Sequence, residues 1–222
     1  MLFEYPERAY FGRVLPKSKI YQHARVSARL RRKFIDQIER ITWAYKLAEE
    51  TVNLRPVDTV PEIEVFVVEL KGDEISQDVI RCIDNAIPFP VIYEIQKGDK
   101  VKVMAAYKRP SDADSNKWVT DVYFESEWQS SSIERETLPI ALDLGVLYEE
   151  ILRRLMPVSR VDAEPIKDQV QRLTEIRRLE SQAAKLESRM HREKQFNRKV
   201  ELNAELRKLK TQVRELTTDG HR

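Results

Sequence analysis

An acidic residue ahead of a strand that ends in Glu-x-Lys could assemble a hydrolytic site in this chain. The pattern occurs in VDTVPEIEVFVVELKG, where Asp58 precedes the apolar run and Glu69 and Lys71 close it. Two carboxylates can hold a divalent ion that activates water, while a lysine stabilises developing charge, as in metal-dependent nucleases of the (D/E)xK type. A solvated strand end gives the same letters, because alternation places Glu69 and Lys71 on one face, where they can form a salt bridge.

Histidine, cysteine and glycine are too scattered to build other common sites. The histidines are His23, His191 and His221, and Cys82 is the only cysteine, so no metal site of the His and Cys type is expected. The five glycines form no phosphate-binding loop, which excludes Walker and Rossmann nucleotide binding. Apart from the nuclease alternative, we therefore expect no catalytic residues, no metal and no cofactor.

Basic residues gather near the N-terminus, although the net charge of the whole chain is only +2. Residues 1–33 contain nine Lys or Arg and two acids. With Tyr10, Phe11 and Tyr21 between them, these cations could combine phosphate contacts with stacking on exposed bases. A solvated helix face or a surface for an acidic protein explains them equally well. The residues that we predict to contact nucleic acid are Lys17, Lys19, Arg25, Arg29, Arg31, Arg32 and Lys33.

The elements that must position these residues indicate an α+β domain over residues 1–160. A helical stripe through Phe34, Ile38, Ile41 and Tyr45 predicts one helix from Ser27 to about Val52. The rest of the domain adds four strands and two further helices, which predicts a mainly antiparallel four-stranded sheet with helices. These elements are a strand in IEVFVVELK, a helix at 76–87, a hairpin in VIYEIQKGDKVKVMAAYK, a polar loop RPSDADSN, a strand in KWVTDVYFESEW and a helix at 140–156.

Residues 161–218 have the composition of a long coiled coil or helical hairpin, followed by an expected disordered tail at 219–222. The segment from Ala163 to Thr218 contains no glycine and one aromatic residue, Phe196. One apolar stripe ends at Met190 and a second includes Leu206, sixteen residues later, which is two more than two heptads, so the two stripes are out of phase. On a straight helix this separation rotates the stripe by about 160°, so either the chain turns near Gln195–Asn197 or one long helix faces different neighbours.

Four sequence blocks resemble one prokaryotic family. They are YPERAYFGRVLPKSKIY, RCIDNAIPFPVIYE, AAYKRPSDADSNKW and REKQFNRKVELNAEL, in this order along the chain. Together they resemble domain-of-unknown-function family 4391, which has no established reaction or catalytic residues to carry over. The resemblance implies a context, namely accessory proteins of loci that encode a superfamily-two helicase and a DNA methyltransferase, as in restriction or phage-defence systems.

These observations favour a non-enzymatic adaptor subunit that uses its helical arm for protein contacts. Expected partners are a helicase or a DNA methyltransferase, with direct DNA binding and homodimerisation through the coiled coil left open. The nuclease alternative uses Asp58, Glu69 and Lys71. A single cysteine and the lack of a signal sequence or an apolar run of membrane-spanning length predict a cytoplasmic protein. The predicted partner-binding residues are Phe196, Arg192, Lys194 and Arg198.

Overall fold

The computed structural model describes residues 2–24, 26–111, 118–161 and 163–218. The chain divides into two compact units, Met1–Met156 and Pro157–Arg222. Three predictions fall wholly or partly outside the described residues: the nucleic-acid contact Arg25, the loop RPSDADSN beyond its third residue, and the disordered tail. Within the described part, no helix combines the length and apolar character needed to cross a membrane.

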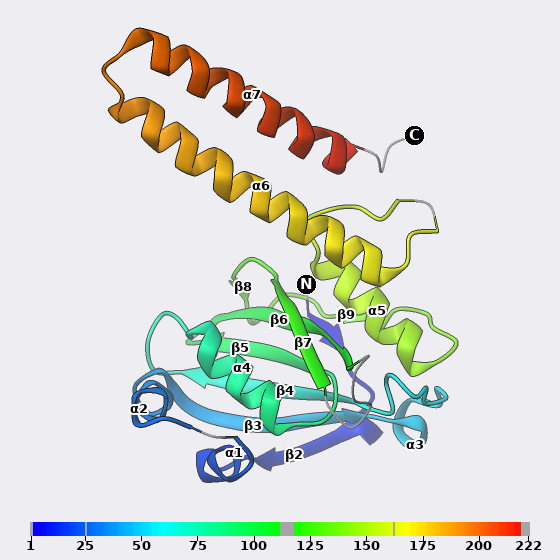
Figure 1. Ribbon diagram of the computed structural model, residues 1–222. Coiled ribbons are helices and arrows are strands. Elements are labelled where there is room, and N and C mark those ends of the chain that lie inside the picture. Colours follow the sequence, from blue (N-terminus) through cyan, green and yellow to red (C-terminus); the bar gives the residue numbers. More distant parts are fainter. Residues whose placement is uncertain (1, 25, 112–117, 162, 219–222) are drawn as a thin grey trace. The chain divides into compact units, whose positions relative to one another are not determined.

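The first unit is an α+β domain built on one mixed sheet (Figure 1). Its described strands follow the order β2-β3-β4-β5-β6-β7, and β8 pairs with β6. Neighbours are antiparallel except β4 and β5, which are parallel because the helix α4 (Gln77–Ala86) carries the chain back between them. The predicted four-stranded, mainly antiparallel sheet is therefore wrong. The strands are β2 (Tyr10–Val14), β3 (Ile38–Leu47), β4 (Ile63–Leu70), β5 (Val91–Lys97), β6 (Lys100–Pro110), β7 (Trp118–Glu125) and β8 (Gln129–Ser130).

The predicted helix from Ser27 to Val52 is wrong over its second half. Ser27 does cap a helix, α2 (Ala28–Gln37), by accepting the Leu30 N–H at 3.2 Å. The chain then becomes β3, whose register against β4 shifts twice. Each β-bulge inserts one extra residue into the strand, so the buried positions recur every third residue and imitate a helical stripe. These buried positions are Ile38, Ile41, Ala44 and Leu47.

The other helices and strands predicted for this unit are present. The hairpin of β5 and β6 turns at Gly98, whose φ of +57° is readily adopted by glycine. The predicted C-terminal helix of the domain is α5 (Leu144–Leu155), which Asp143 caps by accepting the Val146 N–H at 2.8 Å. Several short elements were not predicted: β1 (Phe3–Glu4), the 3-10 helix η1 (Glu7–Ala9), β2, α1 (Lys17–His23), β8 and β9 (Glu136–Thr137), which pairs with β1. The end of the predicted helix from Ser27 to Val52 is a separate short helix, α3 (Glu49–Val52).

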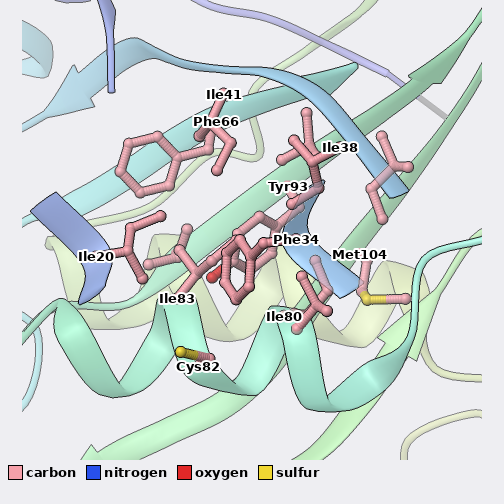
Figure 2. Close-up of a cluster of buried hydrophobic side chains, with 14 of the residues drawn as sticks. Ile20, Phe34, Ile38, Ile41, Phe66, Ile80, Cys82, Ile83, Tyr93 and Met104 are labelled. Atoms are coloured by element: carbon pink, nitrogen blue, oxygen red, sulfur yellow. The ribbon is translucent and has the colours of Figure 1, made fainter. Parts of the chain in front are cut away.

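The sheet is buried on both faces, which explains the continuous apolar run of β4. On one face, Ile20 of α1, Phe34 of α2 and Ile83 of α4 pack with Phe66 and Tyr93 of the sheet (Figure 2). Residues that alternate with these along the strands point to the opposite face and are buried as well. The helices α1, α2 and α4 pack against the first face of the sheet, and α5 packs against β6 and β7.

The second unit contains a helical hairpin (Figure 1). Its helices α6 (Ile166–Arg192) and α7 (Phe196–Thr218) run antiparallel and side by side. The chain turns between them at residues 193–195, with φ −71° and ψ 136° at Glu193. The turn therefore begins slightly before the predicted position near Gln195–Asn197, and Asn197 lies inside α7. Because the chain reverses, the two out-of-phase apolar stripes can face one another. Buried residues on the two helices include Leu179, Ala183, Leu202 and Leu206.

Candidate functional site

The nuclease candidates lie at opposite ends of one strand. Asp58 is exposed in the turn before β4, whereas Glu69 and Lys71 lie at its far end. Six residues of extended chain between Ile63 and Glu69 span roughly 20 Å, too far for two carboxylates to share one ion. Within the described part of the chain, no group of three His, Cys, Asp or Glu side chains is arranged to hold a metal ion.

Glu69 and Lys71 are also occupied by other contacts. The guanidinium of Arg40 donates to Glu69 Oε1 from Nε at 2.8 Å and from Nη2 at 2.5 Å. Lys71 Nζ donates to the carbonyl of Ile35 at 2.9 Å and lies 3.9 Å from a carboxylate oxygen of Glu39. Ion pairs between neighbouring strands are common at sheet surfaces. The geometry therefore gives the nuclease alternative no support.

The end of the helical hairpin exposes an aromatic side chain among cations. Phe196, the first residue of α7, is 78% exposed. Arg192 donates to the carbonyl and hydroxyl of Ser188, and Arg198 lies 3.1 Å from Glu201, while the Lys194 side chain is exposed. The structure thus brings all four predicted partner-binding residues to the turn between α6 and α7. We call Arg192, Lys194, Phe196 and Arg198 the arm tip.

Glu193 orders the backbone beneath the arm tip. Its carboxylate accepts the N–H of Lys194 at 2.8 Å and the N–H of Gln195 at 2.9 Å. These hydrogen bonds, from Gln195 first and Lys194 second, hold the pKa of Glu193 below its ordinary value. The turn is therefore hydrogen-bonded through a side chain just before α7 begins, in the manner of a helix cap.

The open end of the hairpin is closed by Arg172. Its guanidinium binds both carboxylate oxygens of Glu164 at 2.8 Å and donates to the carbonyl of Leu216 at 2.9 Å. Because Leu216 lies near the end of α7 and Arg172 near the start of α6, this arginine joins the two helices. Lys210 and Glu187 add an exposed cross-helix ion pair at 2.6 Å. The two helices that carry the arm tip are therefore joined by side-chain contacts at the opposite end of the hairpin.

The predicted nucleic-acid contacts divide into occupied and exposed residues. Lys17 Nζ donates to the carbonyl of Ile38 at 2.5 Å, and burial lowers the pKa of this lysine. Arg31 stacks over the ring of Tyr21 at 4.9 Å, and Lys33 pairs with Asp78 at 2.6 Å. The remaining described residues of the set, Lys19, Arg29 and Arg32, are exposed on α1 and α2. Some cations of residues 1–33, a segment that we call the basic leader, are therefore held by contacts within the protein, whereas others are exposed and can meet a ligand.

An apolar pocket of about 350 Å³ opens beside the basic leader. Phe11 of β2, Trp43 of β3 and Ile20 of α1 line it, together with residues at the end of α4. The rings of Phe11 and Trp43 are 4.2 Å apart. Cationic side chains, Arg13 and Lys19, also line this pocket, as does His23. A second pocket shares His23, Ala86 and Ile87 with it. We call the first of these the leader pocket.

Buried charged side chains connect separate elements of the first unit. Lys108 Nζ donates to the carbonyls of Asp84 and Ile87 at 2.6 and 2.5 Å, and Tyr123 donates its hydroxyl proton to the Asp84 carboxylate. Burial raises the pKa of Asp84, which Lys108 and Tyr123 oppose. On β5, the buried Glu94 accepts two hydrogen bonds from Arg135, at 2.8 and 2.9 Å. These buried groups hydrogen-bond to one another or to backbone carbonyls, so we assign them a role in stabilising the fold.

A model of one protein family matches almost the whole chain. The family is described as Domain of unknown function (DUF4391), and the match covers residues 3–213. The chain belongs to the DUF4391 family. This result confirms the resemblance carried by the four sequence blocks. Searches of curated proteins and of solved structures gave no match for the DUF4391 chain.

The DUF4391 match includes the arm tip and the leader pocket, since all their residues lie between positions 3 and 213. Sequence reasoning pointed to the arm tip because Phe196 is the only aromatic residue between Ala163 and Thr218. It missed the leader pocket, although Phe11 was noted among the cations. The local pattern around Trp43 predicts a helix, and Trp43 lies 32 positions away from Phe11 in the DUF4391 sequence. The sequence therefore does not indicate that these two rings are neighbours.

Proposed function

We propose that this DUF4391 protein is a non-enzymatic adaptor subunit of a prokaryotic DNA-acting assembly, in which the arm tip binds a partner protein. The observation that carries the proposal is the exposed Phe196, held among Arg192, Lys194 and Arg198 at the turn of a fastened hairpin. Exposed aromatic and arginine side chains are the residue types most enriched at the energetic centres of protein interfaces.

The local contacts suit a binding role. Glu193 orders the turn before a partner arrives, so less conformational entropy is lost when Phe196 becomes buried. The neighbouring cations favour a partner surface with acidic residues around an apolar recess. Because the ion pair of Arg198 with Glu201 is exposed, Arg198 can exchange this partner at little energetic cost.

The kind of partner follows from the family context and is part of the proposal. The resemblance to family 4391 implies loci that also encode a superfamily-two helicase and a DNA methyltransferase, as in restriction or phage-defence systems. We therefore propose one of these enzymes as the partner. No specific observation favours the nuclease alternative, since Asp58 lies at the opposite end of β4 from Glu69 and Lys71.

Truncating the anchor should release the partner. In a tagged purification from the native cell, Phe196→Ala should reduce the amount of helicase or methyltransferase that co-elutes. Its affinity for the purified partner should fall by roughly 30-fold, the effect of a typical interface hot spot. The fold should be unaffected, because the side chain is exposed. Quantitative mass spectrometry of the eluate, followed by titration of the purified partner, measures the change.

Ile140→Ala is the matched control, since Ile140 is an even more exposed apolar residue in the other unit. It should retain the partner. Equal recovery with Phe196→Ala and the parent chain would contradict the role of the arm tip. A lone chain that cuts DNA with Mg²⁺, and loses this activity in Lys71→Ala, would replace the adaptor proposal with the nuclease alternative.

A further inference from the structure

The leader pocket combines an aromatic interior with a cationic rim. Its volume is about 350 Å³, and Phe11, Trp43 and Ile20 form its apolar part. Arg13 and Lys19 are exposed residues that also line it, and its lining includes no carboxylate side chain. The guanidinium carbon of Arg13 lies over the Phe11 ring, 4.6 Å from the ring centre, so a cation–π contact is already present there.

We propose that the leader pocket binds an unstacked base of a single-stranded nucleic acid, with the adjoining phosphates on Lys19 and Arg13. Aromatic side chains bind bases of any sequence through their π-faces, and arginine planes stack on bases in the same way. Phosphate oxygens match the donors of arginine and lysine. An apolar interior with cations at its edge is therefore complementary to a base that carries its phosphate.

The shape of the site selects a single strand. A base can enter a recess only after it has left its stack, which costs least in a strand that is not paired. The sugar and phosphates must remain outside, next to the cations at the rim. Duplex DNA offers no such base without flipping, so its binding here should be weaker than that of a single strand.

A strand can extend from the leader pocket over α2. The ring of Tyr21 on α1 contacts the ring of Phe34 on α2 at 5.4 Å, which places the two helices side by side. Arg31 of α2 stacks on Tyr21, and Arg29 and Arg32 are exposed on the same helix. These cations can meet further phosphates, which favours a polymer over a free nucleotide as the ligand.

The inference is independent of the arm tip. Every residue involved belongs to the first unit, and the experiment requires no partner protein. Failure of single-strand binding would leave the adaptor proposal standing. Loss of the partner in Phe196→Ala would likewise leave the leader pocket unaffected.

The test measures binding of the full chain to a fluorescein-labelled oligothymidylate of about 12 nucleotides, a length within the usual footprint of single-strand binding sites. Lys19→Glu should weaken binding by roughly tenfold and make it less dependent on salt, because a phosphate contact is lost. Ala86→Phe keeps every charge but fills the pocket, because Ala86 lines it, and should weaken binding by roughly fivefold to 100-fold. Circular dichroism and thermal unfolding check that both variants fold.

Lys100→Glu is the matched control, because it makes the same charge change at an exposed position of β6 outside the pocket lining. It should bind nearly as well as the parent chain. The proposal is overturned if no binding occurs, if Lys100→Glu weakens binding as much as Lys19→Glu, or if Ala86→Phe has no effect. Tighter binding of thymidine monophosphate or of a glutamate-rich peptide with one aromatic residue would also overturn it, in favour of a nucleotide or protein ligand.

Discussion

Replacing Lys108 with methionine is expected to lower the free energy of unfolding by about 3–5 kcal/mol, the cost of removing one partner from a buried ion pair. The Lys108 ammonium donates to the carbonyls of Asp84 and Ile87 at the end of α4 and lies 3.6 Å from Asp84 Oδ1. Both side chains are almost completely buried. Without Lys108, the Asp84 carboxylate and two helix-end carbonyls lose their cationic donor. Chemical denaturation of the parent chain and the variant measures the loss.

Two further variants separate the buried pair from a general effect of removing a lysine. Lys100→Met changes an exposed residue of the same strand and should alter stability by less than about 0.5 kcal/mol. The double variant Asp84→Asn with Lys108→Met should lose less than the sum of the single variants, because the carboxylate no longer requires a cation. Additive losses would show that Lys108 acts without Asp84.

A pH-dependent loss of stability is expected from Glu64, and Glu64→Gln should remove it. Burial raises the pKa of Glu64 from 4.5 to about 8, and the neighbouring Glu62 acts in the same direction. Between these two values the folded chain keeps a proton that the unfolded chain has released. Stability should therefore fall as the pH rises through this window, by up to about 1.4 kcal/mol per pH unit. Urea unfolding at several pH values from about 5 to 8 measures this slope.

The glutamine variant should be more stable than the parent chain near pH 8, since an amide does not ionise. Glu69→Gln is the matched control: Glu69 lies on the same strand, but its carboxylate forms a partly exposed ion pair with Arg40. This control should keep the slope of the parent chain. A parent chain whose stability does not change between about pH 5 and pH 8 would refute the raised pKa.

The two candidate surfaces differ in how far the sequence predicts them. The arm tip depends on neighbours in the chain, and the structure brings its four predicted residues together at one turn. The leader pocket depends on Phe11, Trp43 and the end of α4, which are distant in sequence. Only the pairing of β2 with β3 places Phe11 beside Trp43. A site shared among three or more elements leaves no local pattern to detect.

The sequence by itself determined the elements that have strong local signals. The apolar run of IEVFVVELK, the hairpin in VIYEIQKGDKVKVMAAYK and the helix predicted at 140–156 correspond to β4, to β5 with β6, and to α5. The change in composition after residue 160 and the phase shift between the two apolar stripes of the arm likewise anticipated a long helical region in which a hairpin was one of two options.

The tertiary structure decided what depends on contacts between distant segments. Much of the second half of the helix predicted from Ser27 to Val52 is the strand β3. The spacing of its buried residues resembles a helical stripe because its register against β4 shifts at two bulges. The tertiary structure also made β4 and β5 parallel and buried Glu64, Asp84 and Lys108, which local patterns would place at a polar surface. Burial and strand pairing are set by the free energy of the whole fold, whereas propensity and capping act within a few residues.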